Sequence, residues 1–412
     1  MKAAILSIGT ELLFGQVVNT NAAYLSKQLN LLGFDVMYHY TVGDNPKRLQ
    51  EIIGTAFKDC DLIITTGGLG PTQDDLTKEV VCEVFNDVMI TDEKILKWLE
   101  SYFIKHRRIM TENNKKQANM PSRAIIFDND AGTAPGFALE EKEKIIICLP
   151  GPPREMTRMF QLKALPYLEK KTDEVIYYRM IRTFGIGESQ LETDLLDFIT
   201  NQKDPTLATY AKEGECSLRI ASKRKTQEEA EAAVNEMIEK IMPVIGDYIY
   251  SLDDENLADV VGNLLLKKNI SISCAESCTG GMFAETVTTL PGISKVFDRG
   301  LVTYSNKAKM EELGVKEATL ERFGAVSREV AVEMAEGLKR ASDSRLCISV
   351  TGIAGPDGGT PEKPVGLAYI CAILDEKTVT KEIRMRNVSR RWNRNYSVLS
   401  MLNIVYKLLL DE

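Results

Sequence analysis

Short apolar segments alternate with amphipathic segments from the first residues of the chain, and this alternation limits the possible folds more than any other feature. Strands that alternate with helices build a parallel sheet that is covered by helices on both faces. Pro46, directly after Asn45, is a typical helix start. We therefore expect a three-layer α/β/α first domain. Its strands are expected at Ala3–Ile8, Asp35–Val42 and Asp61–Thr66, and its helices at Thr20–Leu32 and Pro46–Phe57.

A glycine-rich segment follows the third expected strand and reads Thr65-Thr-Gly-Gly-Leu-Gly-Pro-Thr-Gln-Asp-Asp-Leu-Thr77. Gly67, Gly68 and Gly70 allow a tight turn and close approach to a phosphate, and the next helix offers its N-terminus to an anion. An ordinary strand-to-helix turn uses the same residues. The loop alone therefore leaves phosphate binding and a simple turn both open.

Four carboxylates are expected beside this loop. Asp74 and Asp75 adjoin it, while Glu11 and Asp44 follow the first and second strands and so lie at the same edge of the sheet. Carboxylates that converge near a phosphate suit a hard divalent cation, which would neutralise a pyrophosphate and activate water. The alternative is that some of them cap helices, and Asp74 and Asp75 can do both.

A second strand-to-helix corner lies in the last third of the chain, within Ile272-Ser-Cys-Ala-Glu-Ser-Cys-Thr-Gly-Gly281. The apolar run Ile270–Cys274 predicts a buried strand, and the glycine pair predicts a turn into a helix. Ser277 would then project from the end of a sheet, facing free backbone N–H groups of the helix's first turn. A serine there is also a common helix cap, and that alternative remains open.

A nucleophilic serine needs a base, and the only histidines, His39 and His106, lie far upstream. A Ser-His-Asp triad is therefore not expected. Lysine can serve instead if burial or a neighbouring cation lowers its pKa. Lys307 and Lys309 are the candidates, on a helix that follows a strand ending near Tyr304.

Another glycine-rich loop, Thr351-Gly-Ile-Ala-Gly-Pro-Asp-Gly-Gly-Thr360, follows the expected strand Leu346–Val350. Its backbone amides can hold a substrate phosphate or a developing oxyanion. Arg390 and Arg394 are spaced i and i+4, so they share a helix face and can bind one phosphate. The alternative is a solvated basic helix start.

The middle of the chain carries no cluster of chemically active residues. Strands are expected at Val175–Phe184, Thr206–Tyr210 and Cys216–Ala221, with helices at Ser189–Ile199, capped by Ser189, and Gln227–Ile241. This order predicts a small α+β module. We interpret it as a spacer between two active parts.

Composition excludes several classes of protein. The formal charge of −8 argues against broad nucleic-acid binding, although the arginines between 384 and 394 form a local basic patch. The chain has no run of about 18 apolar residues, so no membrane span is expected. The apolar run at its start is too short for a signal peptide. Eight scattered cysteines suit reduced core thiols better than disulfides, and Cys274 and Cys278 lack partners for a zinc site. A cytoplasmic location is the simplest expectation.

The last part resembles the deamidase domain of the CinA (competence/damage-inducible protein A) family. The motifs are Ala275-Glu-Ser-Cys-Thr-Gly-Gly281, Gly300-Leu-Val-Thr-Tyr-Ser-Asn-Lys-Ala-Lys309, Gly324-Ala-Val-Ser327 and Thr351–Gly359. The resemblance implies nicotinamide mononucleotide as substrate, Ser277 as nucleophile, Lys309 as base, Tyr304 as an orienting or proton-relay residue, and no cofactor. The residues expected to bind substrate are Thr279, Gly280, Gly281, Thr351, Gly352, Ala354, Gly355, Arg390 and Arg394.

The first part resembles the MoaB/MogA-like molybdopterin-binding fold, in the version that CinA proteins carry. The matching stretches are Gly9–Leu13, Asn19–Asn21, Gly67–Gly70 with Asp75, Gly132–Gly136 and Leu149–Met156. The resemblance implies hydrolysis of ADP-ribose at its pyrophosphate, with Asp75 in a functional position, Gly67, Gly68 and Gly70 binding substrate, a divalent metal of the cobalt or magnesium class, and potassium. Leu69 stands where the molybdopterin relatives have threonine, which favours the pyrophosphatase. Arg154 and Glu155 are further candidates for the same site.

Together these features predict three domains: 1–170, MoaB/MogA-like; 171–250, resembling a KH domain; and 255–412, the deamidase domain. The nucleic-acid-clamping Gly-x-x-Gly loop of KH domains is not visible, so direct nucleic-acid binding is not expected. The last helix, ending at Leu410, has apolar residues on several sides, which indicates burial in a domain or subunit interface, and we expect a homodimer. Two alternatives stay open: a non-enzymatic partner in competence or DNA repair, and a pterin-binding first domain.

Overall fold

The computed structural model describes residues 1–172, 174–212, 214–386 and 388–412. Contacts divide the chain into two compact units. The first comprises Met1–Tyr177 with Ser222–Ala232, and the second comprises Tyr178–Ala221 with Ala233–Glu412. The expected middle module therefore contributes residues to both units, and most of it belongs with the C-terminal part.

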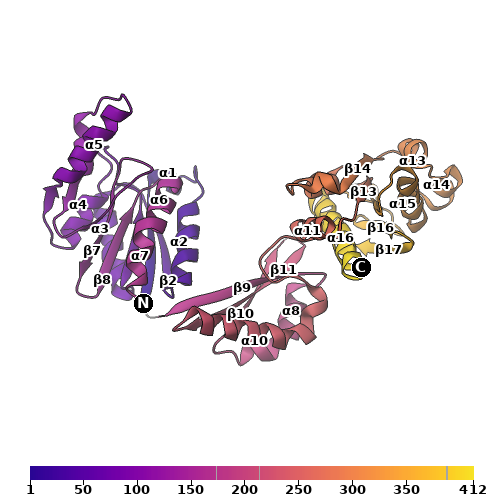
Figure 1. Cartoon of the computed structure of the whole chain (residues 1–412), viewed down its shortest axis with the longest axis horizontal. Coiled ribbons are helices and arrows are strands. Elements are labelled where there is room, and N and C mark those ends of the chain that lie inside the picture. The colour runs from indigo at the N-terminus through magenta and orange to yellow at the C-terminus, as the bar shows by residue number, and fades with distance from the viewer. Residues whose placement is uncertain (173, 213, 387) are drawn as a thin grey trace. The chain divides into compact units, whose positions relative to one another are not determined.

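A six-stranded mixed sheet forms the centre of the first unit, in the order β2-β1-β3-β8-β7-β6 (Figure 1). Neighbours among β2, β1, β3 and β8 run parallel, as predicted, while β7 and β6 are antiparallel additions. The strands are β1 Lys2–Ile8, β2 Asp35–Val42, β3 Leu62–Thr66, β6 Ile125–Phe127, β7 Gly136–Glu141 and β8 Lys144–Leu149. A separate antiparallel pair consists of β4 Met89–Thr91 and β5 Asn119–Pro121.

Helices cover both faces of this sheet and bury two separate apolar cores, so the three-layer prediction is confirmed. One face packs against α2 Thr20–Leu31, α6 Pro153–Met159, the π-helical turn Phe160–Ala164 and α7 Leu165–Glu169. The other packs against α3 Pro46–Asp59, α4 Thr77–Val84 and α5 Glu93–Lys105. Two short helical segments, α1 Thr10–Leu13 and the 3₁₀ segment η1 Glu112–Ala118, lie in the connections.

The middle module is a four-stranded sheet with helices, in the order β10-β11-β9-β12. Its elements are β9 Val175–Phe184, α8 Glu188–Asp194, α9 Leu196–Thr200, β10 Thr206–Lys212, β11 Glu215–Arg224, α10 Gln227–Ile245, η3 Gly246–Tyr248 and β12 Ile249–Ser251. The prediction of one helix capped by Ser189 is wrong. The helix breaks at Leu195, which leaves helical geometry and is fully buried, and the residue before α8 is Gly187, with no side-chain cap.

The C-terminal part is a five-stranded sheet in the order β14-β13-β15-β16-β17, with β14, β13 and β15 parallel and β16 and β17 antiparallel. The strands are β13 Ile272–Glu276, β14 Phe297–Val302, β15 Leu346–Gly352, β16 Leu367–Leu374 and β17 Lys377–Arg384. The strand that was expected to end near Tyr304 is β14, and it ends at Val302.

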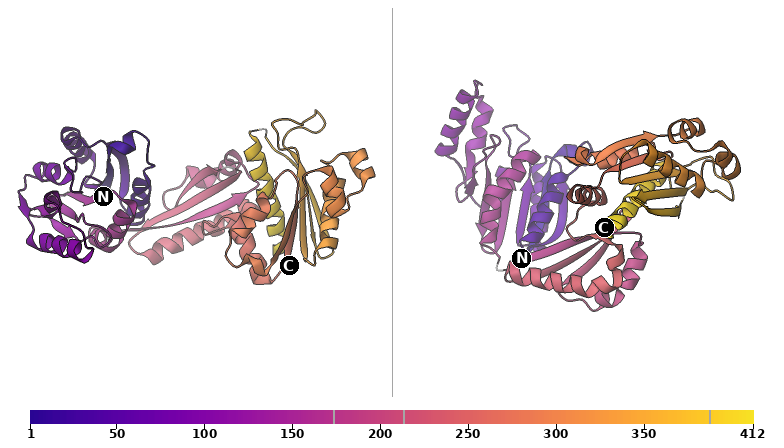
Figure 2. Two further views of the ribbon diagram at one scale, coloured as in Figure 1. Left: turned by 90° about the horizontal axis from the view of Figure 1, so that it is seen from above. Right: turned by 45° about the vertical axis from the view of Figure 1, so that its right-hand side comes forward.

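Helices cover both faces of this sheet as well. α11 Leu257–Lys268, α12 Met282–Thr288 and α16 Arg390–Leu410 share one core, and α13 Asn306–Leu313, α14 Glu317–Phe323 and α15 Arg328–Ala341 share the opposite one. Figure 2 (left) shows the sheet edge-on between α16, in yellow, and the orange helices. The 3₁₀ segment η4 Ile293–Lys295 leads into β14.

The last helix, α16, is buried inside its own unit. Its apolar residues, among them Met401 and Leu402, join the core that also contains Leu257 and Val261 of α11. This burial accounts for apolar residues on more than one side of the helix. Among the residues that the structure describes, no helix is both long and apolar enough to cross a membrane.

Candidate functional sites

The predicted corner at Ser277 is present in the second unit. β13 ends at Glu276, and the backbone N–H of Ser277 donates to Val350 O of the neighbouring strand at 3.1 Å. Gly280 and Gly281 then adopt positive φ angles of 59° and 91°, which turn the chain into α12. Ser277 is therefore held at the end of the sheet by backbone geometry, and its side chain is almost fully buried.

The first turn of α12 is capped by Glu276 and not by Ser277. The buried carboxylate of Glu276 accepts hydrogen bonds from the N–H groups of Gly281 (3.1 Å), Phe283 (3.0 Å) and Ala284 (2.9 Å). The helix-cap alternative for Ser277 is therefore wrong, and so is the expectation that the first-turn amides of α12 are free. The carboxylate of Glu276 accepts from these amides because it lies at the end of the strand that precedes the helix and carries a full charge.

Two amides of the corner remain available to a ligand. In the described part of the chain, the backbone N–H groups of Cys278 and Thr279 donate to no carbonyl or carboxylate oxygen. They come directly after Ser277, which is where an oxyanion formed by attack of its hydroxyl would need donors.

Lys309 contacts the hydroxyl of Ser277, as the sequence predicted. Its Nζ lies 3.0 Å from Ser277 Oγ, 2.8 Å from Thr303 O and 3.3 Å from Tyr304 O. Lys309 is 1% exposed. The other candidate, Lys307, is exposed and pairs with Glu311 on the surface of the same helix, α13, so it is not at the site.

Burial favours the uncharged form of Lys309, and its three oxygen partners can accommodate that form. Burial lowers the pKa of Lys309 below its ordinary value, and the neighbouring Cys278 opposes this shift. Burial also raises the pKa of Cys278 to about 12, so that thiol carries no charge at neutral pH. A neutral amine has two N–H groups and one lone pair. Two carbonyl oxygens, which can only accept, would take the N–H groups, and the lone pair would face the Ser277 hydroxyl.

The first turns of α16 hold both glycine-rich loops of the site. Arg394 donates to Thr279 O through Nε (3.2 Å) and Nη2 (2.6 Å), and Asn393 Nδ2 donates to Ala354 O at 3.0 Å. Arg390 donates to Gly355 O at 2.6 Å. Both arginines therefore bond to backbone carbonyls, although Arg390 is also exposed to solvent, so the alternative of a solvated basic helix start is wrong only in part.

Tyr304 lies at the mouth of this site. Its side chain is 58% exposed, and its hydroxyl accepts a hydrogen bond from Arg390 Nη2 at 2.8 Å. Within the described part of the chain, its hydroxyl bonds to Arg390 and to neither Ser277 nor Lys309, whereas its backbone carbonyl does accept from Lys309. The geometry connects the tyrosine ring to Arg390, which is the group expected to bind phosphate.

Three buried polar atoms near Ser277 lack partners among the described residues: Thr279 Oγ1, Thr303 Oγ1 and Asn393 Oδ1. Buried polar atoms are normally paired, so each can accept or donate to a bound molecule or a water. By contrast, Thr351 Oγ1 is occupied, because it donates to Ala325 O at 2.7 Å. Gly352 ends β15, directly after it.

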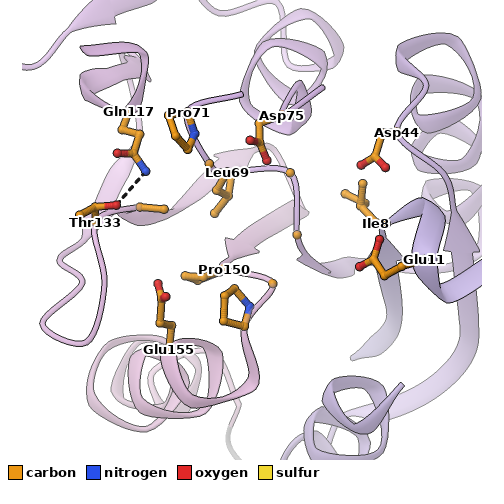
Figure 3. A pocket seen from close by; sticks show the side chains of 17 residues that line it. Ile8, Glu11, Asp44, Leu69, Pro71, Asp75, Gln117, Thr133, Pro150 and Glu155 are labelled. Carbon is orange, nitrogen blue, oxygen red and sulfur yellow. Dashed lines mark hydrogen bonds between the residues drawn. The ribbon is translucent and has the colours of Figure 1, made fainter. Parts of the chain in front are cut away.

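The first unit contains a cleft of about 360 Å³ at the edge of its sheet where β1 and β3 end (Figure 3). Gly67, Gly68 and Gly70 line it, as predicted. Gly67 and Gly68 have φ angles of 103° and 66°, and a Cβ at Gly68 would collide with Thr77 Oγ1. The loop therefore needs glycine at these positions to turn between β3 and α4.

Three of the four predicted carboxylates reach this cleft, together with Glu155, and Figure 3 shows their side chains around it. Asp44 Oδ2 accepts from Thr10 N and Oγ1, and Asp75 Oδ2 accepts from Thr72 N and Oγ1. Asp74 is exposed and does not line the cleft. The expectation that Asp74 and Asp75 cap α4 is also wrong, because Leu76 precedes that helix without any side-chain cap.

The carboxylates of the cleft do not form a closed metal site. Within residues 1–172, 174–212, 214–386 and 388–412, no three histidine, cysteine or acidic side chains lie close enough to bind one ion. The residues nevertheless suit a cation that is bound mainly by its ligand, because Mg²⁺ commonly uses one or two carboxylates plus phosphate oxygens and water. Glu11, Asp44 and Asp75 supply such oxygens.

Sequence reasoning missed several residues of both sites. Glu276 is a lone carboxylate at the end of a buried strand, five residues before the glycine whose amide it accepts, and that pattern was a usable signal. Asn393 lies between the two predicted arginines. Gln117 and Thr133, which hydrogen-bond to each other at 3.2 Å beside the cleft of the first unit, come from distant loops and gave no signal. Arg154 lines a different hollow, whereas Glu155 lines the cleft.

Family models match three consecutive parts of the chain. Residues 4–170 match a "Probable molybdopterin binding domain", residues 178–251 the "Damage-inducible protein CinA KH domain" and residues 254–409 the "CinA C-terminal domain". Together they span nearly all of its length.

Relatives are similar over the same length. A protein of Clostridium perfringens with the name "Putative competence-damage inducible protein" is 51% identical over 404 residues, which is 98% of both chains. One of the same name from Acetivibrio thermocellus is 47% identical over 405 residues, again 98% of both. The crystal structure of competence/damage inducible protein CihA from Agrobacterium tumefaciens is 38% identical and covers 37% of this chain and 96% of its own, with a TM-score of 0.36.

Proposed function

Because the chain belongs to the CinA family of competence/damage-inducible proteins, we propose that its C-terminal domain hydrolyses the amide of nicotinamide mononucleotide. The observation that supports this most is the 3.0 Å contact between Lys309 Nζ and Ser277 Oγ in a buried site. This pair has the nucleophile and the base that amide hydrolysis requires.

In the proposed reaction, neutral Lys309 accepts the proton of Ser277 as Oγ attacks the carboxamide carbon. The N–H groups of Cys278 and Thr279 would donate to the oxyanion of the tetrahedral intermediate. The C–N bond then breaks, and Lys309 returns its proton to the leaving nitrogen, which departs as ammonia. Water, deprotonated by the same lysine, attacks the resulting ester, and nicotinic acid mononucleotide and free Ser277 are formed.

The substrate phosphate is assigned to Arg390 and Arg394 in this proposal. Each guanidinium carries five N–H donors and spends only part of them on loop carbonyls and on Tyr304. The remaining donors can bind phosphate oxygens while the loops stay fixed. Gly280, Gly281, Gly352 and the loop at Ala354–Gly355 would then shape the space for the ribose and the ring.

Ammonia release from nicotinamide mononucleotide by the full-length protein tests the proposal. We expect release that resists a chelator and falls by about 10³-fold or more in Ser277→Ala and Lys309→Met, because nucleophile and base act as one unit. Lys307→Met is the matched control, since Lys307 is an exposed lysine on the same helix, and it should keep full activity. Absence of release from folded protein would refute the amidase and favour a partner role in competence or DNA repair.

For the first domain we propose hydrolysis of ADP-ribose at its pyrophosphate, supported by the carboxylate-lined cleft beside the Gly67–Gly70 loop. The loop amides would hold the pyrophosphate, and Asp75 would face it from the start of the next segment. A divalent cation of the cobalt or magnesium class, held by Asp44, Asp75 or Glu11, would supply charge neutralisation. Potassium belongs to the same proposal by family resemblance.

Release of AMP from ADP-ribose tests this second activity. We expect it to require added divalent metal and to be lost in Asp75→Asn, while Asp74→Asn, an exposed neighbour outside the cleft, should retain it. Metal-independent release, or equal loss in both variants, would refute the assignment. Both proposed products belong to pyridine-nucleotide recycling. A homodimer remains part of the proposal, and sedimentation of the full chain measures it.

A further inference from the structure

A second cavity, of about 390 Å³, lies in the second unit apart from the Ser277 site. Its walls come from the turn between β9 and α8, from residues 211, 212 and 214–216 of β10 and β11 and beside them, from residues 384–386 at the end of β17, and from Trp392 and Tyr396 of α16. None of the residues assigned to the amidase reaction lines it. Its volume lies within the range of pockets that bind small molecules, about 300–1,000 Å³.

The packing that forms this cavity is specific. The rings of Phe184 and Tyr396 lie with their centroids 5.6 Å apart, and both Phe184 and Tyr250 of the middle module belong to the core around α16. Gly214 lies against the Tyr396 ring so closely that a Cβ there would be 3.1 Å from Cδ2. The cavity is therefore bounded by packed elements of one compact unit.

A pair of stacked aromatic rings stands at one wall of the cavity. Trp392 and Tyr396, one helical turn apart on α16, are stacked with centroids 5.1 Å apart and an angle of 10° between their planes. Both line the cavity. Because Tyr396 covers one face of Trp392 and itself packs against Phe184, a planar ring that enters the cavity would stack on the opposite face of Trp392, and stacking on an aromatic ring is how proteins commonly bind nucleobases.

Two basic side chains at the cavity have no other partner. Lys212 and Arg386 line it, and in the described part of the chain neither side chain forms a hydrogen bond or an ion pair. Arg384 also lines it and is paired with Glu382. The acidic groups are Glu188 and Glu215, and Glu215 is occupied by the Tyr250 hydroxyl at 2.5 Å. Free cations beside one free carboxylate suit a ligand with a phosphate and with hydroxyl or amino donors.

We propose that this cavity binds a nucleoside mono- or diphosphate. The base would stack on the face of Trp392 that is turned away from Tyr396, the phosphate would bind Lys212 and Arg386, and Glu188 would accept from a sugar hydroxyl or a base amino group. The site is separate from both proposed catalytic sites and does not depend on their activity. Its ligand chemistry combines a planar ring with an anion, which neither inorganic phosphate nor a free base supplies.

The chain offers a local reporter for this site, because its only tryptophans are Trp98 and Trp392. Trp98 lies on α5 in the first unit, so the Trp98→Phe protein reports on Trp392 alone. Titration of that protein with AMP and with ADP should change Trp392 emission to saturation, and inorganic phosphate should bind at least tenfold more weakly. Arg386→Glu in the same background should weaken nucleotide binding about tenfold or more.

Arg391→Glu is the matched control, because Arg391 is an exposed arginine near the start of the same helix that does not line the cavity. It should leave the binding curve unchanged, and circular dichroism should show both variants folded. No response to millimolar AMP or ADP, or an equal response in Arg386→Glu, would overturn the proposal. Tight binding of a short single-stranded oligonucleotide without any response to mononucleotides would also overturn it and assign the cavity to nucleic acid.

Discussion

Glu276→Gln should destabilise the second unit and disorder the Ser277 corner. Glu276 is fully buried and accepts from three backbone N–H groups, two at Oε2 and one at Oε1. Glutamine keeps one oxygen and replaces the other with an NH₂ group, which would face N–H donors. At least one charge-assisted hydrogen bond is then lost, and bonds of that kind contribute about 1.5–3 kcal/mol each. With the remaining bonds no longer charge-assisted, we expect a loss of roughly 2–4 kcal/mol.

Urea unfolding of the full-length Trp98→Phe protein, followed by Trp392 emission, measures this loss in the unit that contains Glu276. For a slope of about 1–3 kcal/mol per molar urea, the midpoint should fall by about 1 M or more. Ammonia release should fall as well, because the corner holds Ser277. Glu285→Gln is the matched control: it is an exposed acid in the first turn of α12, and its effect should stay within about 0.5 kcal/mol. An unchanged midpoint in Glu276→Gln would refute the capping role.

Three further predictions concern pH and the glycine loop. Amidase activity should fall as pH drops through the lowered pKa of Lys309, because the ammonium form cannot accept the Ser277 proton; a pH–rate profile of ammonia release that is flat across this range would contradict it. Burial lowers the pKa of Lys78 from 10.5 to about 8. Between about pH 8 and pH 10.5 the unfolded chain therefore holds a proton on Lys78 that the native chain lacks. Over this range the free energy of unfolding should rise with pH by roughly 3 kcal/mol. Urea unfolding of the Trp392→Phe protein, followed by Trp98, should show this rise, and Lys78→Met should remove it. Gly68→Ala should cost about 1–3 kcal/mol and lower ADP-ribose hydrolysis because of its positive φ, while Gly54→Ala, which has open space, should be neutral or stabilising in the same unfolding assay.

The fold was largely predictable because its elements are encoded locally. Apolar runs set the strands of both sheets, and the start of α3 at Asn45 and Pro46 could be predicted from those two residues. The errors were local as well. The break between α8 and α9 arises because Leu195 is buried against the middle module. A buried leucine fits the apolar pattern of a continuous helix equally well, so the sequence did not predict the break.

The Ser277 and Lys309 pair was predictable for a different reason. Adjacent parallel strands bring their carboxyl ends to one edge, and β13 pairs with β14, so a residue after β13 meets a residue on the helix after β14. Position in the topology placed both groups, and the absence of nearby histidines selected lysine. The residue pattern alone did not decide between Lys307 and Lys309, because that choice depends on the face of α13 that is buried, and only the family resemblance selected Lys309.

The hydrogen bonds from the first turns of α16 to the two glycine-rich loops could not be predicted from the sequence. They join residues far apart in the chain, and their acceptors are backbone carbonyls. Any residue has a carbonyl, so Thr279, Ala354 and Gly355 carry no signal that an arginine or asparagine will bind them. These hydrogen bonds also change how the roles of Arg390 and Arg394 are understood. A guanidinium that is already fixed by a loop carbonyl loses little side-chain entropy when phosphate binds to its remaining donors. Holding the loops and binding an anion are therefore not competing roles for Arg390 and Arg394, since the first prepares the second.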